Sequence, residues 1–516
     1  MKAVKSRRCS VADGYSVAGV FNNTAGIWPH TKLTTNGEMV EEEQLAEKKP
    51  ATWPQLLAAV VVNLNTFVTG SAMVWPAMAL PQLVSAESGL RDRPLTADEA
   101  SWVASLLLLS ALVVIPLFAV ASAHVGRKTL GYVTITPLLA SLIIQMFSVS
   151  IEALYIARVL AGVQVGGSLM LTALYVSETA SDEVRGRLGC MLPLLCNSGN
   201  LFAYVIGAFL PYYTVLYVNL APAVIFIISF AFIPETPYRL ATVHQYEQAR
   251  KALRWLRRGI SDEQVEREME RIRSSLVADG TKEGSAGRVS LREICSRASL
   301  KGFANVIVLS ANLQFCGSYV VLNYAVMMFD EAGGSVPSEV ATIVLGALQV
   351  VGTVASVVAV DRLGRRPLLF LSNGVVGTSV TVMGVYMYLK QDTQTDLSSV
   401  GWLPATCLSI YILMLSFGLN SLPHVVVLEI VAPRIRGLAA IATYTVIAGT
   451  AAIMTKLYPA MSEAIGAYGS FWFFAAVCLT CAVIGWWLLP ETKGRPLEDI
   501  LKELNGSKDV IVSSSK

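Results

Sequence analysis

Long apolar segments are the feature that most constrains how this chain can fold. A helix needs about 20 apolar residues to cross roughly 30 Å of hydrocarbon, and twelve segments of the 516-residue sequence reach that length. They span residues 55–79, 101–121, 129–149, 152–176, 188–210, 213–233, 303–328, 340–360, 367–389, 402–427, 438–460 and 467–489. The alternating ten-residue pattern of a lipid-facing barrel is absent. We therefore predict an all-α polytopic membrane protein with twelve transmembrane helices.

Composition excludes most soluble classes of protein. Charged residues make up only 15% of the chain and hydrophobic residues 54%, whereas soluble domains carry about 25% charged residues. The net charge of +3 gives no reason to expect a nucleic-acid partner. No glycine-rich loop followed by Lys-Ser/Thr is present to hold a nucleotide phosphate. We expect a membrane protein rather than an enzyme, with no cofactor and no metal, and with no requirement for an oligomer.

The apolar segments divide the chain into five regions. We predict an N-terminal tail over 1–52, a six-helix half over 53–233, a polar insertion over 234–302, a second six-helix half over 303–489 and a C-terminal tail over 490–516. The insertion contains two amphipathic stretches, 246–258 and 261–276, and Ser261 with Gln264 fits a capping box at the start of the second. A small helical bundle is favoured over a solvated linker because the apolar faces need a packing partner.

Basic residues in the short loops predict the orientation in the membrane. They concentrate on one side of the predicted bundle: Arg127, Lys128, Arg185, Arg187, Arg362, Arg365, Arg366, Arg434 and Arg436. That side is predicted to be cytoplasmic, and an even number of spans then places both termini and the 234–302 insertion there. Lys456 lies toward the other side, in the eleventh span, and is expected to extend to the lipid headgroups.

The two halves repeat one another in three places. Gly126-Arg127-Lys128 after span two matches Gly364-Arg365-Arg366 after span eight. Glu178, seven residues before Arg185-Gly186, matches Glu429, seven residues before Arg436-Gly437. Pro234-Glu235-Thr236 ends span six, and Pro490-Glu491-Thr492 ends span twelve. Three matches in the same order indicate a duplicated six-helix unit, as in the major facilitator fold.

These motifs carry a closer resemblance to a known family. The resemblance rests on Arg158-x-x-x-Gly162, Glu178 with Arg185-Gly186, Pro234-Glu235-Thr236-Pro237, Asp361-Arg362-Leu363-Gly364-Arg365-Arg366, Glu429 with Arg436-Gly437, and Pro490-Glu491-Thr492-Lys493-Gly494. Over residues 55–500 the chain resembles the sugar porter family of the major facilitator superfamily. The stretch Met328-Phe329-Asp330-Glu331-Ala332-Gly333 is similar to the insect trehalose transporter-like branch.

The resemblance implies a cytoplasmic gate of paired charges. Charged side chains at the membrane edge are costly unless paired, and in this family such clusters close the cytoplasmic side when the site faces outward. The predicted network comprises Arg127, Arg158, Glu178, Arg185, Glu235, Asp361, Arg365, Glu429, Arg436 and Glu491, arranged as two clusters between the halves. The alternative is that these charges only set topology, which would not require the glutamates. The first copy has Ala123-His124 where the family has Asp-Arg, so its cluster lacks one acidic member.

Polar residues inside the spans are the candidates for substrate binding, because a neutral hydroxyl-rich solute needs amide, hydroxyl and aromatic partners. The predicted substrate-binding residues are Gln314, Asn323, Tyr324, Gln349 and His424. Gln314 and Tyr324 match the family pattern in span seven, whereas Asn323 departs from it. His424 stands where hexose carriers have tryptophan, and it is either a ligand or a packing residue. Gln314 is either a substrate contact or a bond between helices.

The family's pocket is further changed in this chain, because Pro193 replaces a usual glutamine and Ile447 a usual asparagine. No Asp or Glu lies in the middle of any span, and proton-coupled symporters need such a titratable carboxylate. The sequence therefore predicts a facilitative plasma-membrane transporter of a neutral sugar, such as trehalose or a hexose, that works by alternating access. The alternative is a non-transporting sugar sensor on the same scaffold.

Overall fold

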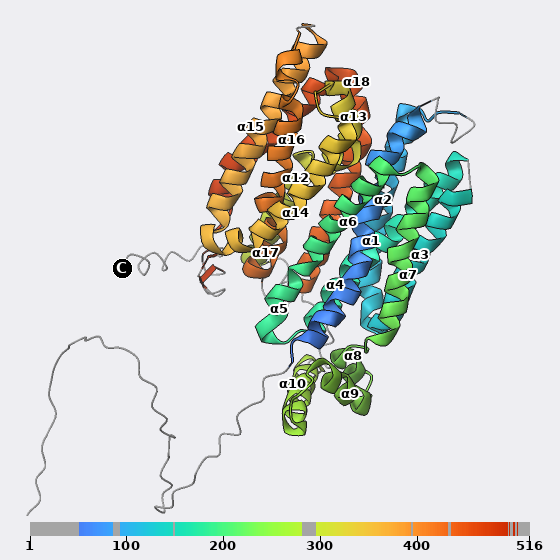
Figure 1. The fold of residues 1–516 in the computed structure, drawn as a ribbon. Coiled ribbons are helices and arrows are strands. Elements are labelled where there is room, and N and C mark those ends of the chain that lie inside the picture. Colours follow the sequence, from blue (N-terminus) through green and yellow to red (C-terminus); the bar gives the residue numbers. More distant parts are fainter. Residues whose placement is uncertain are drawn as a thin grey trace, which may run out of the picture. The chain divides into compact units, whose positions relative to one another are not determined.

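The computed structural model describes residues 51–85, 93–147, 150–280, 296–393, 396–431 and 435–493, together with 495, 499, 500 and 503. Most of the N-terminal tail and of the C-terminal tail lies outside these residues. The first half and the region after it contain α1 (Trp53–Val84), α2 (Ala97–His124), α3 (Arg127–Phe147), α4 (Ile151–Thr179), α5 (Asp182–Gly189), α6 (Met191–Phe209), α7 (Tyr212–Phe232), α8 (Pro237–Thr242), α9 (Tyr246–Leu256) and α10 (Asp262–Gly280). The second half contains α12 (Arg297–Phe315), α13 (Ser318–Ala332), α14 (Ser338–Leu363), α15 (Arg365–Gln391), α16 (Leu403–Met414), α17 (Leu422–Ile430) and α18 (Arg436–Leu488) (Figure 1).

Twelve spans are present among the described residues, as predicted. Eleven continuous helical segments are long and apolar enough to cross a membrane. The last of them is two helices joined at Gly466, whose φ of 76° and ψ of 160° are not helical. Counting the two parts of α18 separately gives twelve spans, and no strand occurs in the described part of the chain.

Spans seven and ten are interrupted inside the membrane. Span seven breaks between α12 and α13 at Gly317, which has a φ of 89°. A Cβ atom at this position would lie 2.7 Å from the ring of Phe474, so glycine is required by both backbone conformation and space. In span ten, α16 passes through one π-helical turn, Leu415–Leu419, into α17. Such interruptions are tolerated in membranes where protein surrounds the freed backbone groups.

The polar insertion forms a small helical unit with its own core. Leu240, Ala249, Leu253, Val265 and Met269 from α8, α9 and α10 pack together and are buried. The predicted capping box is present, because the Ser261 N–H donates to Gln264 and the Gln264 N–H donates to Ser261. Arg257 donates to the carbonyl of Thr179 at the end of α4, 2.8 Å away, and so attaches this unit to the first half.

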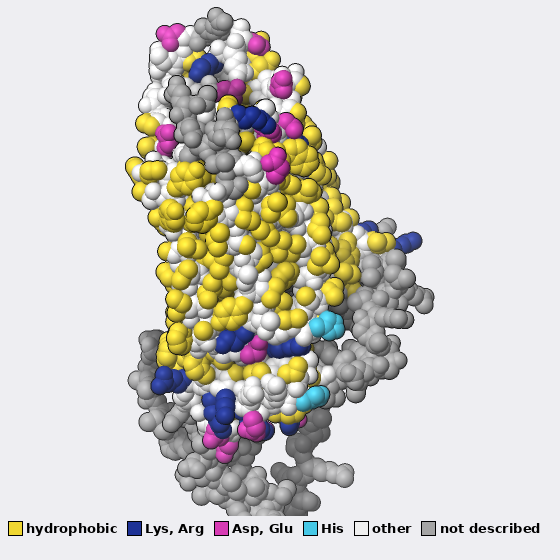
Figure 2. Space-filling model, turned by 90° about the vertical axis from the view of Figure 1, so that its right-hand side faces the viewer, with side chains coloured by type: hydrophobic (Ala, Val, Ile, Leu, Met, Phe, Trp, Pro, Cys, Tyr) yellow, Lys and Arg dark blue, Asp and Glu magenta, His cyan; other side chains and the backbone are white. Residues whose placement is uncertain are grey.

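The outer surface of the helices is apolar between two charged zones. Figure 2 shows hydrophobic side chains covering the middle of this face, with lysine, arginine and acidic side chains gathered toward either end. Large apolar side chains such as Leu117, Val120, Phe209, Phe232 and Trp487 are between 62% and 81% exposed. Such a surface is stable only in contact with lipid, which agrees with a multi-pass membrane protein.

The two halves meet along three pairs of helices. In the described chain α1 contacts α13, α6 contacts α14, and α2 contacts α18. We call the end of the bundle that carries Arg127 and Arg365 the basic end, and the end that carries the start of α2 the opposite end.

Candidate functional site

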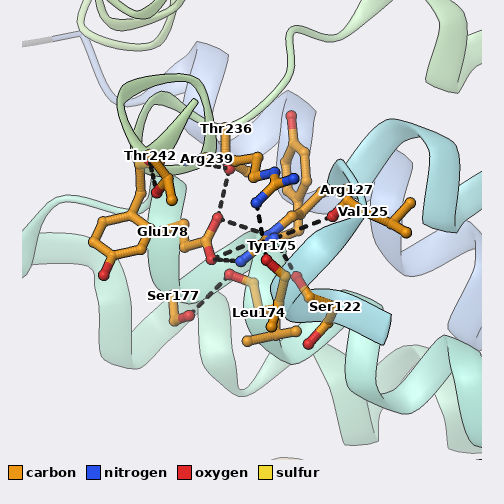
Figure 3. A network of polar contacts seen from close by, with 12 residues as sticks. Ser122, Val125, Arg127, Leu174, Tyr175, Ser177, Glu178, Thr236, Arg239 and Thr242 are labelled. Atoms are coloured by element: carbon orange, nitrogen blue, oxygen red, sulfur yellow. Dashed lines mark hydrogen bonds and ion pairs between the residues drawn. The ribbon is translucent and has the colours of Figure 1, made fainter. Parts of the chain in front are cut away.

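The first ion-pair cluster lies at the basic end of the first half. The Arg127 guanidinium, at the start of α3, pairs with Glu178 near the end of α4, with 2.6 Å between Nη2 and Oε1. It also donates to the carbonyl of Ser122, 2.7 Å away. Thr236 donates to the same Glu178 carboxylate. Figure 3 shows these side chains converging from three segments of the chain, and both charged side chains are about nine-tenths buried.

Glu235 completes this cluster by capping a helix. Its carboxylate accepts the backbone N–H groups of Arg127 and Lys128, both at 3.0 Å. These N–H groups begin α3 and have no partner within the helix. A carboxylate at a helix N-terminus also interacts favourably with the helix dipole. Glu235 therefore fixes the end of span six against the start of span three.

The second half repeats the cluster contact by contact. Arg365 pairs with Glu429 and donates to the carbonyl of Val360 at 3.0 Å. Glu491 accepts the backbone N–H groups of Arg365 and Arg366 at 3.0 and 3.1 Å, and Thr492 donates to Glu429. Burial raises the pKa of Glu491, but these backbone donors lower it by more, so its pKa lies below the ordinary value.

The ion pairs Arg127–Glu178 and Arg365–Glu429 each lie within one half, which corrects the expectation that these residues would pair between the halves. Each arginine and its glutamate lie on neighbouring helices of one half, and a carboxylate that binds its own arginine bidentately has little capacity for a partner farther away. Arg185 donates to the carbonyl of Ala180, also within its half. The side chains of Asp361 and Arg436 lie outside the described residues.

Arg158 does not belong to this network, so its assignment to the gate is wrong. It lies near the beginning of α4, toward the opposite end, and is 1% exposed. Its guanidinium donates to the carbonyls of Val103 and Ala72 at 2.9 and 3.0 Å and lies 5.3 Å from the ring centroid of Trp75. Glu178 follows Arg158 by 20 residues in the same helix, which is about 30 Å along the helix axis.

The predicted substrate residues of span seven lie buried around its break. Gln314 lies in the last turn of α12. Its Oε1 accepts a hydrogen bond from Ser318 at 2.8 Å, and its Nε2 is buried without a hydrogen-bond partner. Asn323 donates to the carbonyl of Tyr319, and its Oδ1 is likewise unpartnered. The Tyr324 hydroxyl contacts the carbonyl of Thr455 at 3.3 Å. Unused buried donors and acceptors are costly, which makes Gln314 and Asn323 suited to a polar ligand.

Gln349 lies where the two halves meet. Its Oε1 accepts from the Asn200 amide of α6 at 3.0 Å, across the boundary between the halves. One turn away, Asn197 donates to Thr353 at 2.7 Å. His424 does not join this group: its ring packs against Tyr444, with 5.1 Å between centroids.

Asn197 and Asn200 were missed by the sequence prediction, although two asparagines three residues apart in an apolar span are a detectable signal. A second missed group lies inside the first half, where Gln164 donates to Asn65 and Thr69, each at 2.9 Å. Asn65 in turn donates to Thr134 at 3.1 Å. The Oε1 of Gln164 is buried without a partner, so this group also has an acceptor to offer.

Comparisons with known proteins agree with this architecture. The sequence profile described as "Sugar (and other) transporter" matches residues 51–504. The chain belongs to this family. Family membership confirms the resemblance to sugar porters and the prediction of a membrane transporter rather than an enzyme.

Curated relatives of this sugar transporter family member include insect proteins. The "Facilitated trehalose transporter Tret1-2 homolog" of Drosophila simulans is 32% identical over 88% of this chain and 92% of its own length. The "Facilitated trehalose transporter Tret1" of Drosophila willistoni is 31% identical over 88% of this chain. The chain spans about half the length of that relative, 51%.

Solved structures confirm the major facilitator fold. The inward-open xylose transporter XylE from E. coli has a TM-score of 0.70 at 20% identity and is matched over 86% of this chain and 99% of its own. The partially occluded inward-open form of XylE has a TM-score of 0.69 at 19% identity, over 86% and 99% of the two chains.

Proposed function

We propose that this family member is a facilitative transporter of a neutral sugar, such as trehalose or a hexose, that works by alternating access in the plasma membrane. The observation that carries the proposal is the set of buried amide side chains near the boundary of the halves. Asn200 and Gln349 face one another across that boundary, and Gln314 holds an unused amide donor. Amides match the hydroxyl groups of a sugar and leave no net charge in the site. The relatives named as trehalose transporters support trehalose as the first substrate to test.

A uniport mechanism is supported by the surroundings of the buried arginine. In the described part of the chain Arg158 has no carboxylate partner; it binds two carbonyl groups and lies near Trp75. The other polar side chains that line the small cavity beside it, Ser71, Gln145 and Asn219, are neutral. This cavity therefore contains no carboxylate that could couple sugar movement to a proton gradient.

The polar contacts between the halves support a site that is closed toward the opposite end. Asn197, Asn200 and Tyr204 follow one another along α6 toward that end, and each bonds the second half. At the basic end, the ion pairs Arg127–Glu178 and Arg365–Glu429 each lie within one half. With the basic end in the cytoplasm, as the distribution of basic residues predicts, we infer an inward-facing conformation.

Uptake measurements test the proposal directly. Cells lacking sugar carriers that express the protein should take up at least one of radiolabelled trehalose, glucose, fructose or a polyol. Uptake should be saturable, stop at equal concentrations inside and outside, and be unaffected by a protonophore. Accumulation above the outside concentration that a protonophore abolishes would refute uniport. Sugar binding by the purified protein without any uptake would favour the sensor alternative.

A matched pair of variants tests Gln314. Losing one or two hydrogen bonds to a neutral ligand costs on the order of 1–3 kcal/mol, or roughly 5- to 150-fold in affinity. Gln314→Ala should reach the membrane in normal amount and raise the half-saturating sugar concentration by that factor. Asn305→Ala is the control, because the buried Asn305 amide donates to the carbonyl of Lys301 within its own helix, at the basic end. Unchanged half-saturation with low surface abundance of Gln314→Ala would show a structural role instead, and would move the site toward Gln349 and Asn200.

A further inference from the structure

One charged side chain connects the two halves at the opposite end of the bundle. Lys456 of α18 donates from Nζ to Asp98 at 2.5 Å and to Ser101 at 2.7 Å, both on α2. The same ammonium group lies 4.3 Å from the ring centroid of Trp102. These contacts correct the expectation that Lys456 extends to the headgroups. Three groups of the other half hold its ammonium group, and its side chain is only 25% exposed.

This contact differs in kind from the others between the halves. Tyr319 contacts Met73, and Tyr204 donates to the carbonyl of Leu322, both without formal charge. The Lys456–Asp98 pair is an ion pair that crosses from the first half to the second, whereas Arg127–Glu178 and Arg365–Glu429 each lie within one half.

The geometry of α2 makes its first turns a suitable partner for a lysine. Thr96 caps the helix through a complete capping box with Glu99, so the position of Asp98 is fixed by the backbone. Ser101 and Trp102 follow on the next turn, and Ser101 is 2% exposed. One face of α2 therefore presents a carboxylate, a hydroxyl group and an aromatic ring to the ammonium group, and each of the three interacts favourably with a cation.

We propose that Lys456 of one half, with Asp98, Ser101 and Trp102 of the other, forms a latch that holds the opposite end closed and must open before the site is exposed there. The proposal rests on the alternating-access function proposed above and on the predicted orientation, which makes this end extracellular. When α2 and α18 separate at this end, the ammonium group loses all three partners together. The latch therefore favours the inward-facing conformation.

The expected effect is a shift in population and not a loss of fold. Asp98 is 76% exposed, so the ion pair by itself contributes little. With the contributions of Trp102 and Ser101, removing the ammonium group should increase the outward-facing population roughly 5- to 30-fold. Lys456→Met removes the charge and keeps an apolar stem of similar length, whereas Lys456→Arg keeps a cation.

The test measures access from outside the cell. A reporter cysteine is placed at Met73, where the halves touch through Tyr319, and its reaction rate with a membrane-impermeant maleimide is measured in intact cells. The same protein without the reporter gives the background from the native cysteines. Lys456→Met should raise the rate roughly 5- to 30-fold at equal surface abundance. Lys456→Arg should stay near the parent rate, and Asp98→Asn should give a smaller rise than Lys456→Met.

An unchanged reaction rate in Lys456→Met, or a rise seen only after the cells are permeabilised, would overturn the latch. Because cysteine labelling does not require sugar transport, its result is independent of the result of the uptake assays. If Lys456→Met raises the labelling rate but the parent protein moves no sugar, the latch stands and the proposed transport is refuted. If the parent transports sugar but Lys456→Met leaves the labelling rate unchanged, only the latch is refuted.

Discussion

Replacing Gly317 by alanine should destabilise the protein and impair the break in span seven. Gly317 has a φ of 89°, and holding a residue with a Cβ atom in this region costs roughly 1–2 kcal/mol. The new methyl group would also lie 2.7 and 2.8 Å from two atoms of the Phe474 ring. Overpacking of this kind typically costs another ~1–3 kcal/mol, so Gly317→Ala should lose about 2–5 kcal/mol in total.

A second glycine provides the control for this prediction. Gly374 lies inside α15, and a Cβ atom there would meet no atom within 4 Å. Alanine stabilises a helix interior by about 0.5–1 kcal/mol relative to glycine, so Gly374→Ala should be neutral or slightly stabilising. The two substitutions therefore have opposite expected signs although their chemistry is identical.

Thermal denaturation of the purified protein in one detergent, followed by tryptophan fluorescence, compares the two variants. Gly317→Ala should denature at a clearly lower temperature than the parent, and Gly374→Ala should not. Gly317→Ala should cost less in a Phe474→Leu background than in the parent, because the clash is relieved there and the part due to the backbone remains. Equal denaturation temperatures for the two alanine variants would refute the reasoning from φ and ring contact.

Three further predictions concern the basic end. Glu178→Gln should destabilise the protein more than Glu429→Gln in the same denaturation assay. The side chain of Glu178 is 11% exposed and that of Glu429 is 26% exposed, so solvent screens the Arg365–Glu429 pair more strongly. Equal effects of the two substitutions would contradict this prediction. The lowered pKa of Glu491 means that its contribution to stability is present above its unfolded pKa of about 4.5 and is lost as the pH falls through its lower folded value. The parent should therefore lose stability over that acidic range, and Glu491→Gln should lose less; identical pH profiles would exclude a role for Glu491. Epitope tags at either terminus should be reached by antibody only after permeabilisation, and staining of intact cells would reverse the predicted orientation.

Much of the architecture followed from the sequence because it depends on local properties of the chain. The thickness of the hydrocarbon region fixes how many consecutive apolar residues a span needs, so the spans can be counted directly along the sequence. The sequence also predicted that Arg127, Glu178, Arg365 and Glu429 belong to charge clusters at the basic end, although it placed their pairing between the halves. Each charge lies within a few residues of a span end, and the buried edge of a membrane protein leaves an arginine few partners other than the nearest carboxylate.

The contacts between the halves were decided only by the tertiary structure. Asn200 meets Gln349, and Lys456 meets Asp98, across sequence separations of 149 and 358 residues. Successive side chains along a helix point in directions about 100° apart. Because the spans are apolar on all sides, the sequence does not reveal which face of a helix meets the other half. The sequence could therefore place Arg158 in a span but could not show that its partners are two carbonyl groups and Trp75 instead of a carboxylate. That choice depends on how far the helices are rotated and how closely they pack, which is a property of the assembled bundle.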